Sequence, residues 1–401
     1  MPELPGEGLP ILIHDVASQR LVAPATPGES ARLYVCGITP YDSTHMGHAS
    51  TYVAFDVLHR AWRDSGCKVT YVQNVTDIDD PLFARARATG QSWSDIALRE
   101  MDRFRDDMTA LRVIPPAHYV TVTEHIHGII NWIELLVQAG FTYTLDGDLY
   151  FDLGSASDFG GVSHLSAVQM IETFAQRGGD PLRPGKRGPL DPVLWVASQA
   201  DEPSWITSFG EGRPGWHIEC VAIALDHLGD TLSVQGGGSD LAFPHHEMCR
   251  AQVQASGKFE EFAAAYVHAG MVSLNGEKMS KSLGNLVFIS NLRNDGVDPM
   301  AIRLAIMSNH YSSDWEWTSD LLVVAETRLS LWRSALALQG GADSQSLLGQ
   351  IRIALSQDLN TPSALAAVDA WARDTLAGDQ SDETSQGLVA RTLDSLLGIG
   401  I

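Results

Sequence analysis

The chain has 401 residues, of which 44% are hydrophobic and 19% are charged. These values are typical of a folded enzyme with more than one subdomain, and they exclude a disordered or collagen-like chain. The 27 Lys and Arg against 49 Asp and Glu give a net charge of −22. A general nucleic-acid-binding protein is therefore disfavoured, because affinity for a phosphate backbone comes mostly from basic side chains.

The four cysteines, at positions 36, 67, 220 and 249, are too few for a disulfide scaffold and form no CxxC pair. We therefore expect reduced thiols in a cytoplasmic protein, with metal binding or catalysis as their potential uses. The acidic N-terminus lacks a basic segment followed by an apolar one, so we do not expect a secretory signal. No apolar run approaches about 20 residues, so we expect no membrane span.

The first predicted elements form a strand, a helix and a second strand. Residues 32–38 are short, apolar and rich in β-formers, which predicts a buried strand. Residues 45–66 carry apolar side chains at helical spacing, and residues 68–75 again predict a strand. This order indicates a βαβ unit with a parallel sheet. Further helices are predicted over 94–111 and 125–140, and further strands over 231–236 and 266–272.

Two later segments differ from this pattern. Residues 142–215 combine short β-like pieces with loops rich in Gly, Pro and Arg, which predicts an insertion into the sheet domain. Residues 321–401 carry four helical patterns and predict a helical bundle. We therefore expect an α/β fold divided into residues 1–115 (first half of the sheet domain), 116–215 (inserted subdomain), 216–290 (second half), 291–320 (linker subdomain) and 321–401 (bundle).

An HxGH motif, His45-Met46-Gly47-His48, stands where the first strand leads into the first helix. The start of a helix attracts anions, because its backbone N–H groups are unpaired and its dipole is positive there. Gly47 allows a nucleotide to approach the backbone closely. Alone the motif is weak, since two histidines near a helix start are more often ordinary surface or core residues.

A second motif is Lys278-Met279-Ser280-Lys281-Ser282. Two lysines around small hydroxyl residues make a cationic loop that suits a pyrophosphate leaving group. Such a segment alone would usually be a solvated basic loop, but a local cluster of cations is less expected by chance in so acidic a chain.

The two motifs together, in this order and around a parallel-sheet pattern, resemble the HIGH and KMSKS signatures of class I aminoacyl-tRNA synthetases. The resemblance implies the Rossmann-like catalytic domain of that class, with His45, His48, Lys278 and Lys281 as catalytic residues. It also implies in-line attack of a carboxylate on the α-phosphate of ATP, assisted by Mg²⁺, to form an acyl-adenylate and pyrophosphate.

Three residues stand in longer phrases: Cys36 in YVCGITPYD, Cys220 in GRPGWHIEC and His245 in GGGSDLAFPHHE. Any one alone could be a buried structural residue. The phrases resemble cysteinyl-tRNA synthetases and their relatives, in which the matching residues bind one zinc ion (Zn²⁺). Three protein ligands leave a tetrahedral position open, which the resemblance assigns to the substrate thiolate. The hydroxyl of serine is a poorer ligand, so selectivity for cysteine need not involve editing.

One position departs from the synthetase pattern, in which a glutamate four residues after the histidine usually provides a further ligand. Here that position is Cys249, and Glu247 comes two residues after His245. On a helix His245 and Cys249 share a face and Glu247 does not. The sequence leaves two interpretations of Cys249 open, a fourth ligand or a bystander thiol.

Further details resemble the cysteine ligases of mycothiol biosynthesis, a family of actinobacterial paralogues of cysteinyl-tRNA synthetases. They are Pro40, Pro81, the phrase RGGDPLRPGK at 177–186 and the end of the chain at Ile401. The ligases carry an ERGGDP signature, and here Gln176 replaces its glutamate. We expect no anticodon-reading domain after the bundle. Residues 320–401 hold five Arg, no Lys and ten acidic residues, whereas a tRNA-binding surface needs local positive charge.

The resemblance implies ATP-dependent ligation of L-cysteine to the amine of glucosaminyl-inositol through a cysteinyl-adenylate. Trp216 could equally be a core aromatic residue, and Asp240 a turn residue. The contacts implied for ATP and the adenylate are Cys36, Gly37, Ile38, Thr39, Thr51, Asn74, Val75, Thr76, Trp216, Gly238, Ser239, Asp240, Val272, Lys278, Met279, Ser280, Lys281 and Ser282.

The acceptor site is poorly determined. Asp77, Asp79, Asp80 and the 177–186 loop are candidates by position, although each acid could simply cap or solvate a turn. We expect small-molecule partners (L-cysteine, ATP and glucosaminyl-inositol), no nucleic acid, no membrane, and a monomer. Two other interpretations stay open: a truncated cysteinyl-tRNA synthetase, and a catalytically silent zinc-binding paralogue. The intact HMGH and KMSKS motifs argue against the second.

Overall fold

A five-stranded parallel sheet forms the centre of the computed structural model, which describes residues 1–155, 159–229, 231–279 and 284–401. The strand order is β12-β11-β3-β4-β5, and every neighbouring pair is parallel. The predicted parallel sheet is therefore confirmed. Its strands are β3 (Ser30–Ile38), β4 (Lys68–Val75), β5 (His118–Thr121), β11 (Val234–Gly238) and β12 (Tyr266–Ala269).

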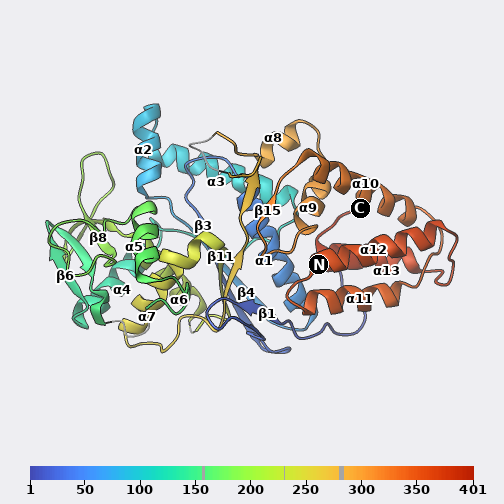
Figure 1. Ribbon diagram of the computed structural model, residues 1–401, viewed down its shortest axis with the longest axis horizontal. Helices are drawn as coiled ribbons and strands as arrows, with labels where there is room; N and C mark the ends of the chain where they lie inside the picture. The colour runs from blue at the N-terminus through green and yellow to red at the C-terminus, as the bar shows by residue number, and fades with distance from the viewer. Residues whose placement is uncertain (156–158, 230, 280–283) are drawn as a thin grey trace.

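Helix α1 (Met46–Asp64) connects β3 to β4 and carries the HMGH motif at its start. Its apolar side chains are buried over nearly the whole length, because the sheet lies against one side and the C-terminal helices against the other (Figure 1). The helix ends at Asp64, followed by Gly66 at a φ of +89°, a conformation that glycine adopts readily. The start of α1 therefore lies at the carboxyl end of β3, where open α/β sheets place their ligands.

The β3–β4 pairing is regular from Ser30 to Val35 and shifts before Ile38. Gly37 lies within this shift. A Cβ atom added there would come 1.6 Å from the carbonyl oxygen of Asn74 on β4, so only glycine fits. This close approach holds the carboxyl ends of the two central strands together beneath the site described below.

The inserted segment forms a second, antiparallel sheet of order β6-β7-β8-β10-β9, at the left of Figure 1. It packs through a hydrophobic cluster that also contains helix α6 and one face of the parallel sheet. The elements of this region are α4 (Ile126–Gln138), β6 (Thr142–Leu145), β7 (Asp148–Phe151), η1 (Leu153–Ser155), α5 (Ala167–Gln176), β8 (Val193–Ala197), β9 (Trp205–Thr207) and β10 (Gly210–Pro214).

The remaining elements lie in the chain before the C-terminal helices. They include a β1–β2 hairpin and a three-stranded sheet of order β14-β13-β15. Their bounds are β1 (Ile13–Asp15), β2 (Arg20–Val22), α2 (Asp80–Thr89), α3 (Trp93–Ala110), α6 (Trp216–Leu228), η2 (Ser239–Leu241), η3 (Ala242–His246), α7 (Glu247–Ala255), β13 (Val272–Leu274), β14 (Glu277–Lys278), α8 (Ile289–Asn294), α9 (Pro299–Met307) and β15 (Trp315–Glu316).

The C-terminal helices form the predicted bundle, at the right of Figure 1. They share one continuous hydrophobic core with α1 and α9. The buried Arg303 of α9 reinforces this contact, because its guanidinium donates to Asp56 of α1 and to the carbonyl oxygen of Leu397. The helices are α10 (Ser319–Leu336), α11 (Ser344–Ser356), α12 (Thr361–Leu376), α13 (Ser385–Thr392) and η4 (Leu393–Leu397). The finer division of the chain into five units stays a prediction.

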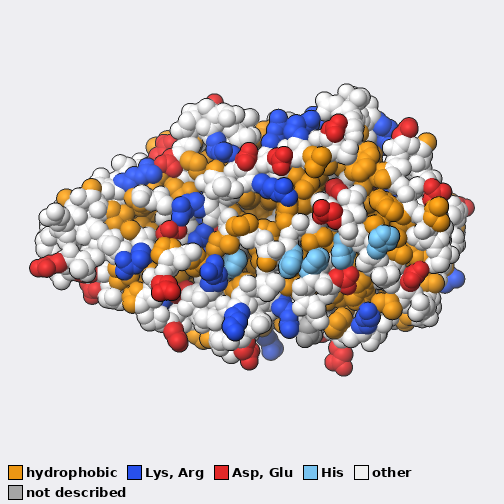
Figure 2. Space-filling model, turned by 180° about the vertical axis from the view of Figure 1, so that it is seen from behind, with side chains coloured by type: hydrophobic (Ala, Val, Ile, Leu, Met, Phe, Trp, Pro, Cys, Tyr) orange, Lys and Arg blue, Asp and Glu red, His pale blue; other side chains and the backbone are white. Residues whose placement is uncertain are grey.

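The surface seen from behind mixes acidic, basic and apolar side chains, with histidines grouped near the middle of the face (Figure 2). None of the described helices combines the length and the apolar character that crossing a lipid bilayer requires.

Candidate functional site

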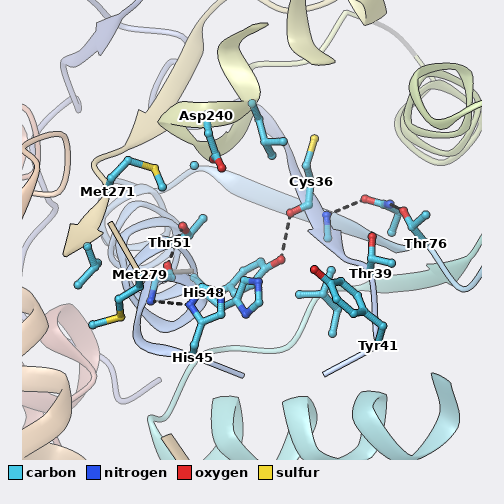
Figure 3. Close-up of a pocket in the computed structure, with 18 of the residues that line it drawn as sticks. Cys36, Thr39, Tyr41, His45, His48, Thr51, Thr76, Asp240, Met271 and Met279 are labelled. Atoms are coloured by element: carbon cyan, nitrogen blue, oxygen red, sulfur yellow. Dashed lines mark hydrogen bonds between the residues drawn. The ribbon is translucent and has the colours of Figure 1, made fainter. Parts of the chain in front are cut away.

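A cavity of about 590 Å³ opens at the carboxyl ends of β3 and β4, above the start of α1. Figure 3 shows His45 and His48 at its lower side, Asp240 above, and Thr39, Tyr41 and Thr76 on the side away from Met271 and Met279. The residues that line it are Cys36, Gly37, Ile38, Thr39, Tyr41, His45, Gly47, His48, Thr51, Tyr52, Asn74, Thr76, Trp216, Cys220, Gly238, Asp240, Leu241, Gly270, Met271, Val272, Met279 and Leu286.

Most residues that the sequence assigned to a site line this one cavity, including both motif histidines and two of the three predicted metal ligands. Val75 and Ser239 are not part of its wall, and Val75 is fully buried in the core. Lys278 begins the second motif within β14. The side chain of Lys278, together with Ser280, Lys281 and Ser282, lies outside the described residues.

Cys36, Cys220 and His245 come together although they are far apart in the chain. One ligand atom from each, two thiol sulfurs and an imidazole nitrogen, lies within 4.8 Å of the other two. All three side chains are buried. A tetrahedral zinc with ordinary Zn–S and Zn–N bonds separates such atoms by about 3.5–3.8 Å, so a small contraction would close the group on an ion. The donors and their spacing therefore fit a metal site.

Burial shifts the ionisation of two of these residues, Cys220 and His245. It raises the pKa of the Cys220 thiol well above its usual value, and the nearby Cys36 adds to the effect. Burial also lowers the pKa of His245 well below the usual value for imidazole. The protein alone thus favours a neutral Cys220 thiol and a neutral His245 imidazole, and bound positive charge would favour the thiolate that metal binding requires.

Neighbouring histidines hold the two ends of this group in place. Nε2 of His246 lies 3.3 Å from Sγ of Cys36, and its Nδ1 lies 2.8 Å from Nε2 of His268 on β12. Nδ1 of His217 lies 3.0 Å from Nδ1 of His245. Such partners orient metal ligands. These three histidines were not predicted from the sequence, and the only signal for one of them was the doubled histidine in the phrase PHHE.

Cys249 is not among the three residues whose ligand atoms all lie within 4.8 Å of one another, although it lies close to one of them. Its sulfur donates to the carbonyl oxygen of His217 at 3.4 Å and lies 3.9 Å from Nε2 of His245. Glu247 points elsewhere, since its carboxylate accepts hydrogen bonds from the backbone N–H groups of Gly160, Val162 and Ser163. The bystander thiol stays our prediction for Cys249, because it falls outside the three-residue group.

The HMGH motif forms the opposite end of the cavity. His45 is the N-cap of α1, and its Nδ1 accepts a hydrogen bond from the backbone N–H of Gly47 at 3.1 Å. The ring of His48 stacks on that of His45 with 3.8 Å between the centroids. Thr51, one turn later, donates to the carbonyl oxygen of Gly47. The cap orients both imidazoles at the positive end of the helix, which suits them to phosphate oxygens.

The side chain of Asn74 organises the floor of the cavity. Its Oδ1 accepts from the backbone N–H of Gly37 at 2.7 Å and from the hydroxyl of Tyr34, and its Nδ2 donates to Oγ1 of Thr76. Tyr52 on α1 donates to the carbonyl oxygen of Cys36 at 3.1 Å. These bonds hold the backbone after Cys36 in one position. Tyr52 was not predicted as a site residue, because its spacing in the sequence indicated only a buried helix face.

Arg177 connects the inserted segment to the loop that carries Asp240. Its guanidinium donates to the carbonyl oxygens of Asp240 and Phe243. The rest of the 177–186 segment is engaged with its own subdomain, where Lys186 bonds Asp180 at 2.7 Å and Arg183 bonds Asp148. The segment therefore supports the glycine-rich loop from behind and does not line the cavity.

Three carboxyl groups, Asp77, Asp79 and Glu219, interact with one another and form what we call the acidic group. None of them lines the cavity, but Asp79 accepts a hydrogen bond from the lining Thr39 and Glu219 precedes the lining Cys220. Burial raises the pKa of Asp79 to about 6 and also raises that of Asp77. Burial, and then the charge of Asp79, raise the pKa of Glu219 well above its usual value. Arg213 faces the group but pairs with Asp80 and with Glu202 at 2.8 Å.

Comparison with known proteins gives the chain a family context. Residues 23–327 match the family described as tRNA synthetases class I (C) catalytic domain. A protein of Streptomyces griseus named L-cysteine:1D-myo-inositol 2-amino-2-deoxy-alpha-D-glucopyranoside ligase is 56% identical, over 100% of this chain and 98% of the relative. A protein of the same name from Thermomonospora curvata is 54% identical, over 100% and 97%.

Solved structures add a likeness of fold. Methionyl-tRNA synthetase of Mycobacterium tuberculosis in complex with methionyl-adenylate matches with a TM-score of 0.65 at 16% identity, over 93% of this chain and 90% of that one. The leucyl-tRNA synthetase of Agrobacterium radiobacter K84, in a ternary complex with tRNA, matches with a TM-score of 0.65 at 11% identity, over 92% and 84%. At these identities the likeness concerns the fold alone.

Proposed function

The chain belongs to the family of L-cysteine:1D-myo-inositol 2-amino-2-deoxy-alpha-D-glucopyranoside ligases, within the class I (C) tRNA synthetases, and on this premise we propose that it ligates L-cysteine to the amine of glucosaminyl-inositol in mycothiol biosynthesis. The family resemblance drawn from the motifs is thereby confirmed. One observation of the structure carries the proposal: Cys36 and Cys220 of the three-residue group line the same cavity as the start of the HMGH helix.

The thiol of cysteine belongs at the Cys36–Cys220–His245 end of the cavity. These residues would hold zinc, which when bound supplies a Lewis acid that lowers the pKa of a coordinated thiol. The indole of Trp216 stacks on the ring of His245 with 4.3 Å between centroids and lines the same end. A side chain larger than that of cysteine would therefore meet a fixed aromatic wall.

The nucleotide belongs at the other end. His45 and His48 would contact the phosphates, and the lysines of the second motif would stabilise the departing pyrophosphate, with Mg²⁺ carried by ATP. Asp240 would accept hydrogen bonds from the ribose hydroxyls, and Val272 would contact adenine. In the first step a carboxylate oxygen of cysteine attacks the α-phosphorus and pyrophosphate leaves. In the second step the acceptor amine attacks the carbonyl carbon and AMP leaves.

A truncated cysteinyl-tRNA synthetase is the weaker alternative. The relatives that match over 97–98% of their own length are named ligases of an amino sugar. The bundle also has little positive charge available for binding a tRNA backbone. Four of its five arginines, at positions 328, 333, 352 and 373, form ion pairs with carboxylates. We therefore propose small-molecule partners and no nucleic acid. The cytoplasmic location and the monomeric state stay predictions.

The test separates the two steps. Purified protein with ATP, Mg²⁺ and cysteine should exchange pyrophosphate into ATP, and addition of glucosaminyl-inositol should release AMP and form an amide. Cysteinyl-tRNA formation without amide formation would show a synthetase, and the absence of cysteine-dependent exchange would show a silent paralogue. Serine in place of cysteine is the matched control, and it should support little exchange.

The metal assignment has its own test. Cys36→Ala should lose bound zinc and cysteine-dependent exchange together, whereas Cys249→Ser should keep both. Zinc retained by Cys36→Ala would contradict the proposed ligand set, and zinc lost from Cys249→Ser would make Cys249 a fourth ligand.

A further inference from the structure

The acidic group defined above, Asp77, Asp79 and Glu219, has no part in the proposed binding of the cysteine thiol or of the nucleotide. Asp77 and Asp79 come from the segment between β4 and α2, and Glu219 comes from α6. Two separate elements thus converge on one place next to Cys220. A role for this group rests on the proposed function, because it concerns the acceptor that the second step requires.

Asp79 is connected directly to the cavity wall. Its Oδ1 accepts the backbone N–H of Asp80 and so caps α2, while its Oδ2 accepts the hydroxyl of Thr39 at 3.3 Å. Thr39 lines the cavity three residues after Cys36, on the side away from Met271 and Met279 (Figure 3). An ionised carboxylate has about four acceptor positions, so Asp79 keeps capacity for a ligand group.

Glu219 supplies an observation independent of the loop. The residue is 1% exposed, and its Oε2 has no hydrogen-bond partner within the described part of the chain. A buried polar atom without a partner destabilises the folded chain, so an unpaired oxygen one residue before Cys220 of the cavity wall points to a donor that arrives with a ligand. Asp77 differs, because Thr123 satisfies it through both its backbone N–H and its hydroxyl.

The partners already present leave the acidic group open to a hydrogen-bond donor. Arg213 is the basic side chain that faces Asp79 and Glu219, and it is already bonded to Asp80 and Glu202. The uncharged neighbours are the hydroxyls of Thr39 and Tyr41. A neutral primary amine, which donates through its N–H groups and keeps the lone pair that attacks a carbonyl carbon, complements these carboxyl oxygens.

We propose that Asp79, with Glu219 beside it, forms the subsite that receives the amine of the acceptor, and that Asp79 takes the proton which this amine releases. The amine nitrogen attacks the carbonyl carbon of the cysteinyl-adenylate. The C–N bond forms, the bond from that carbon to the phosphate oxygen breaks, and AMP leaves with the electron pair. The amine loses one proton in becoming the amide, and this proton passes to Asp79 and then to water, since Asp79 is partly exposed.

The acid–base properties of Asp79 agree with this role. Burial raises its pKa to about 6, so near neutral pH it is ionised and is a stronger base than a surface aspartate. The carboxyl of Asp79 can therefore also release the proton again at each turnover.

The variant Asp79→Asn separates proton acceptance from helix capping. Asparagine caps helices as well as aspartate does, but its amide accepts no proton near neutral pH. Cysteine-dependent pyrophosphate exchange should stay within about twofold of wild type. Transfer from preformed cysteinyl-adenylate to glucosaminyl-inositol, followed in a single turnover, should fall by about 10²–10³-fold. The remaining rate should rise with pH as more of the amine becomes unprotonated.

Two further variants make the outcome decisive. Asp102→Asn removes a carboxylate charge from α3, at a side chain that is 77% exposed and pairs with Arg105, and should leave the transfer rate unchanged. Glu219→Gln should raise the KM for the acceptor about tenfold while zinc content and exchange persist. An unchanged KM would remove Glu219 from the subsite.

Transfer by Asp79→Asn within threefold of wild type would overturn the proposal. A raised KM for cysteine in the exchange reaction would also overturn it, by assigning the carboxyl groups to the amine of cysteine. If the wild-type protein exchanges pyrophosphate but transfers cysteine to no amino sugar, the proposed function itself fails, and this result is distinct from a failure of Asp79.

Discussion

Replacement of Gly37 by alanine tests how closely the site depends on the approach of β3 to β4. The added Cβ would lie 1.6 Å from the carbonyl oxygen of Asn74, whereas real Cβ atoms essentially never come nearer than 3.0 Å. The strand ends must therefore separate by the difference between 3.0 and 1.6 Å, which is 1.4 Å. Because Gly37 follows Cys36 directly, this movement displaces a proposed metal ligand and the adjoining cavity floor.

A misplacement of about 1 Å can reduce the rate of an enzyme about 10²-fold. We therefore expect Gly37→Ala to lower cysteine-dependent pyrophosphate exchange by at least about 100-fold and to reduce zinc content. Gly349 in α11 is the matched control, because a Cβ there meets nothing within 4 Å. Gly349→Ala should keep full activity and gain up to about 1 kcal/mol of stability from helix propensity. Exchange by Gly37→Ala within threefold of wild type would refute this reasoning.

Three further changes test other contacts. Arg177→Met removes the donor to the carbonyl oxygen of Asp240. It should raise the KM for ATP in the pyrophosphate-exchange assay about tenfold, which corresponds to about 1.4 kcal/mol of binding free energy. An unchanged KM would show that the loop of Asp240 holds its shape without Arg177. His246→Ala removes the partner of the Cys36 sulfur. Its zinc affinity, measured by competition with a chelator, should be about 10–100-fold weaker than that of wild type. A zinc affinity equal to that of wild type would contradict the role of His246 in orienting Cys36. Arg303→Ala leaves a buried carboxylate on α1 with one fewer partner and should lower the free energy of unfolding by about 3–5 kcal/mol; a loss below about 1 kcal/mol in urea would count against the buried ion pair.

Part of the fold and of the site could be predicted from the sequence, and particular residues show why. The strand over 68–75 matches β4 in both bounds, because alternation and β-branched residues act over a few neighbours along the chain. Cys36, Cys220 and His245 could be named because their phrases resemble a family, and the structure brings one ligand atom of each within 4.8 Å of the others.

Other residues carried no comparable signal. His268 supports Cys36 through His246, yet nothing in the phrase YVHAGMV marks it. Arg177 was assigned by position to the acceptor, and the structure places it behind the loop of Asp240. The contacts of His268 and Arg177 depend on the packing of segments far apart in the chain. No local pattern in a single sequence marks which distant residues will touch.

The sequence by itself determined the order of elements, the chemistry of the two motifs and the donor types available for a metal. Each of these depends on residue identity or on spacing over a few residues. Only the tertiary structure decided that Cys36, Cys220 and His245 form one group without Cys249 and that Glu219 lies near Asp79. Parallel strands joined by long crossovers bring distant segments together, and the burial of the shared core sets their register, so the contacts at the strand ends emerge only when the whole sheet has assembled.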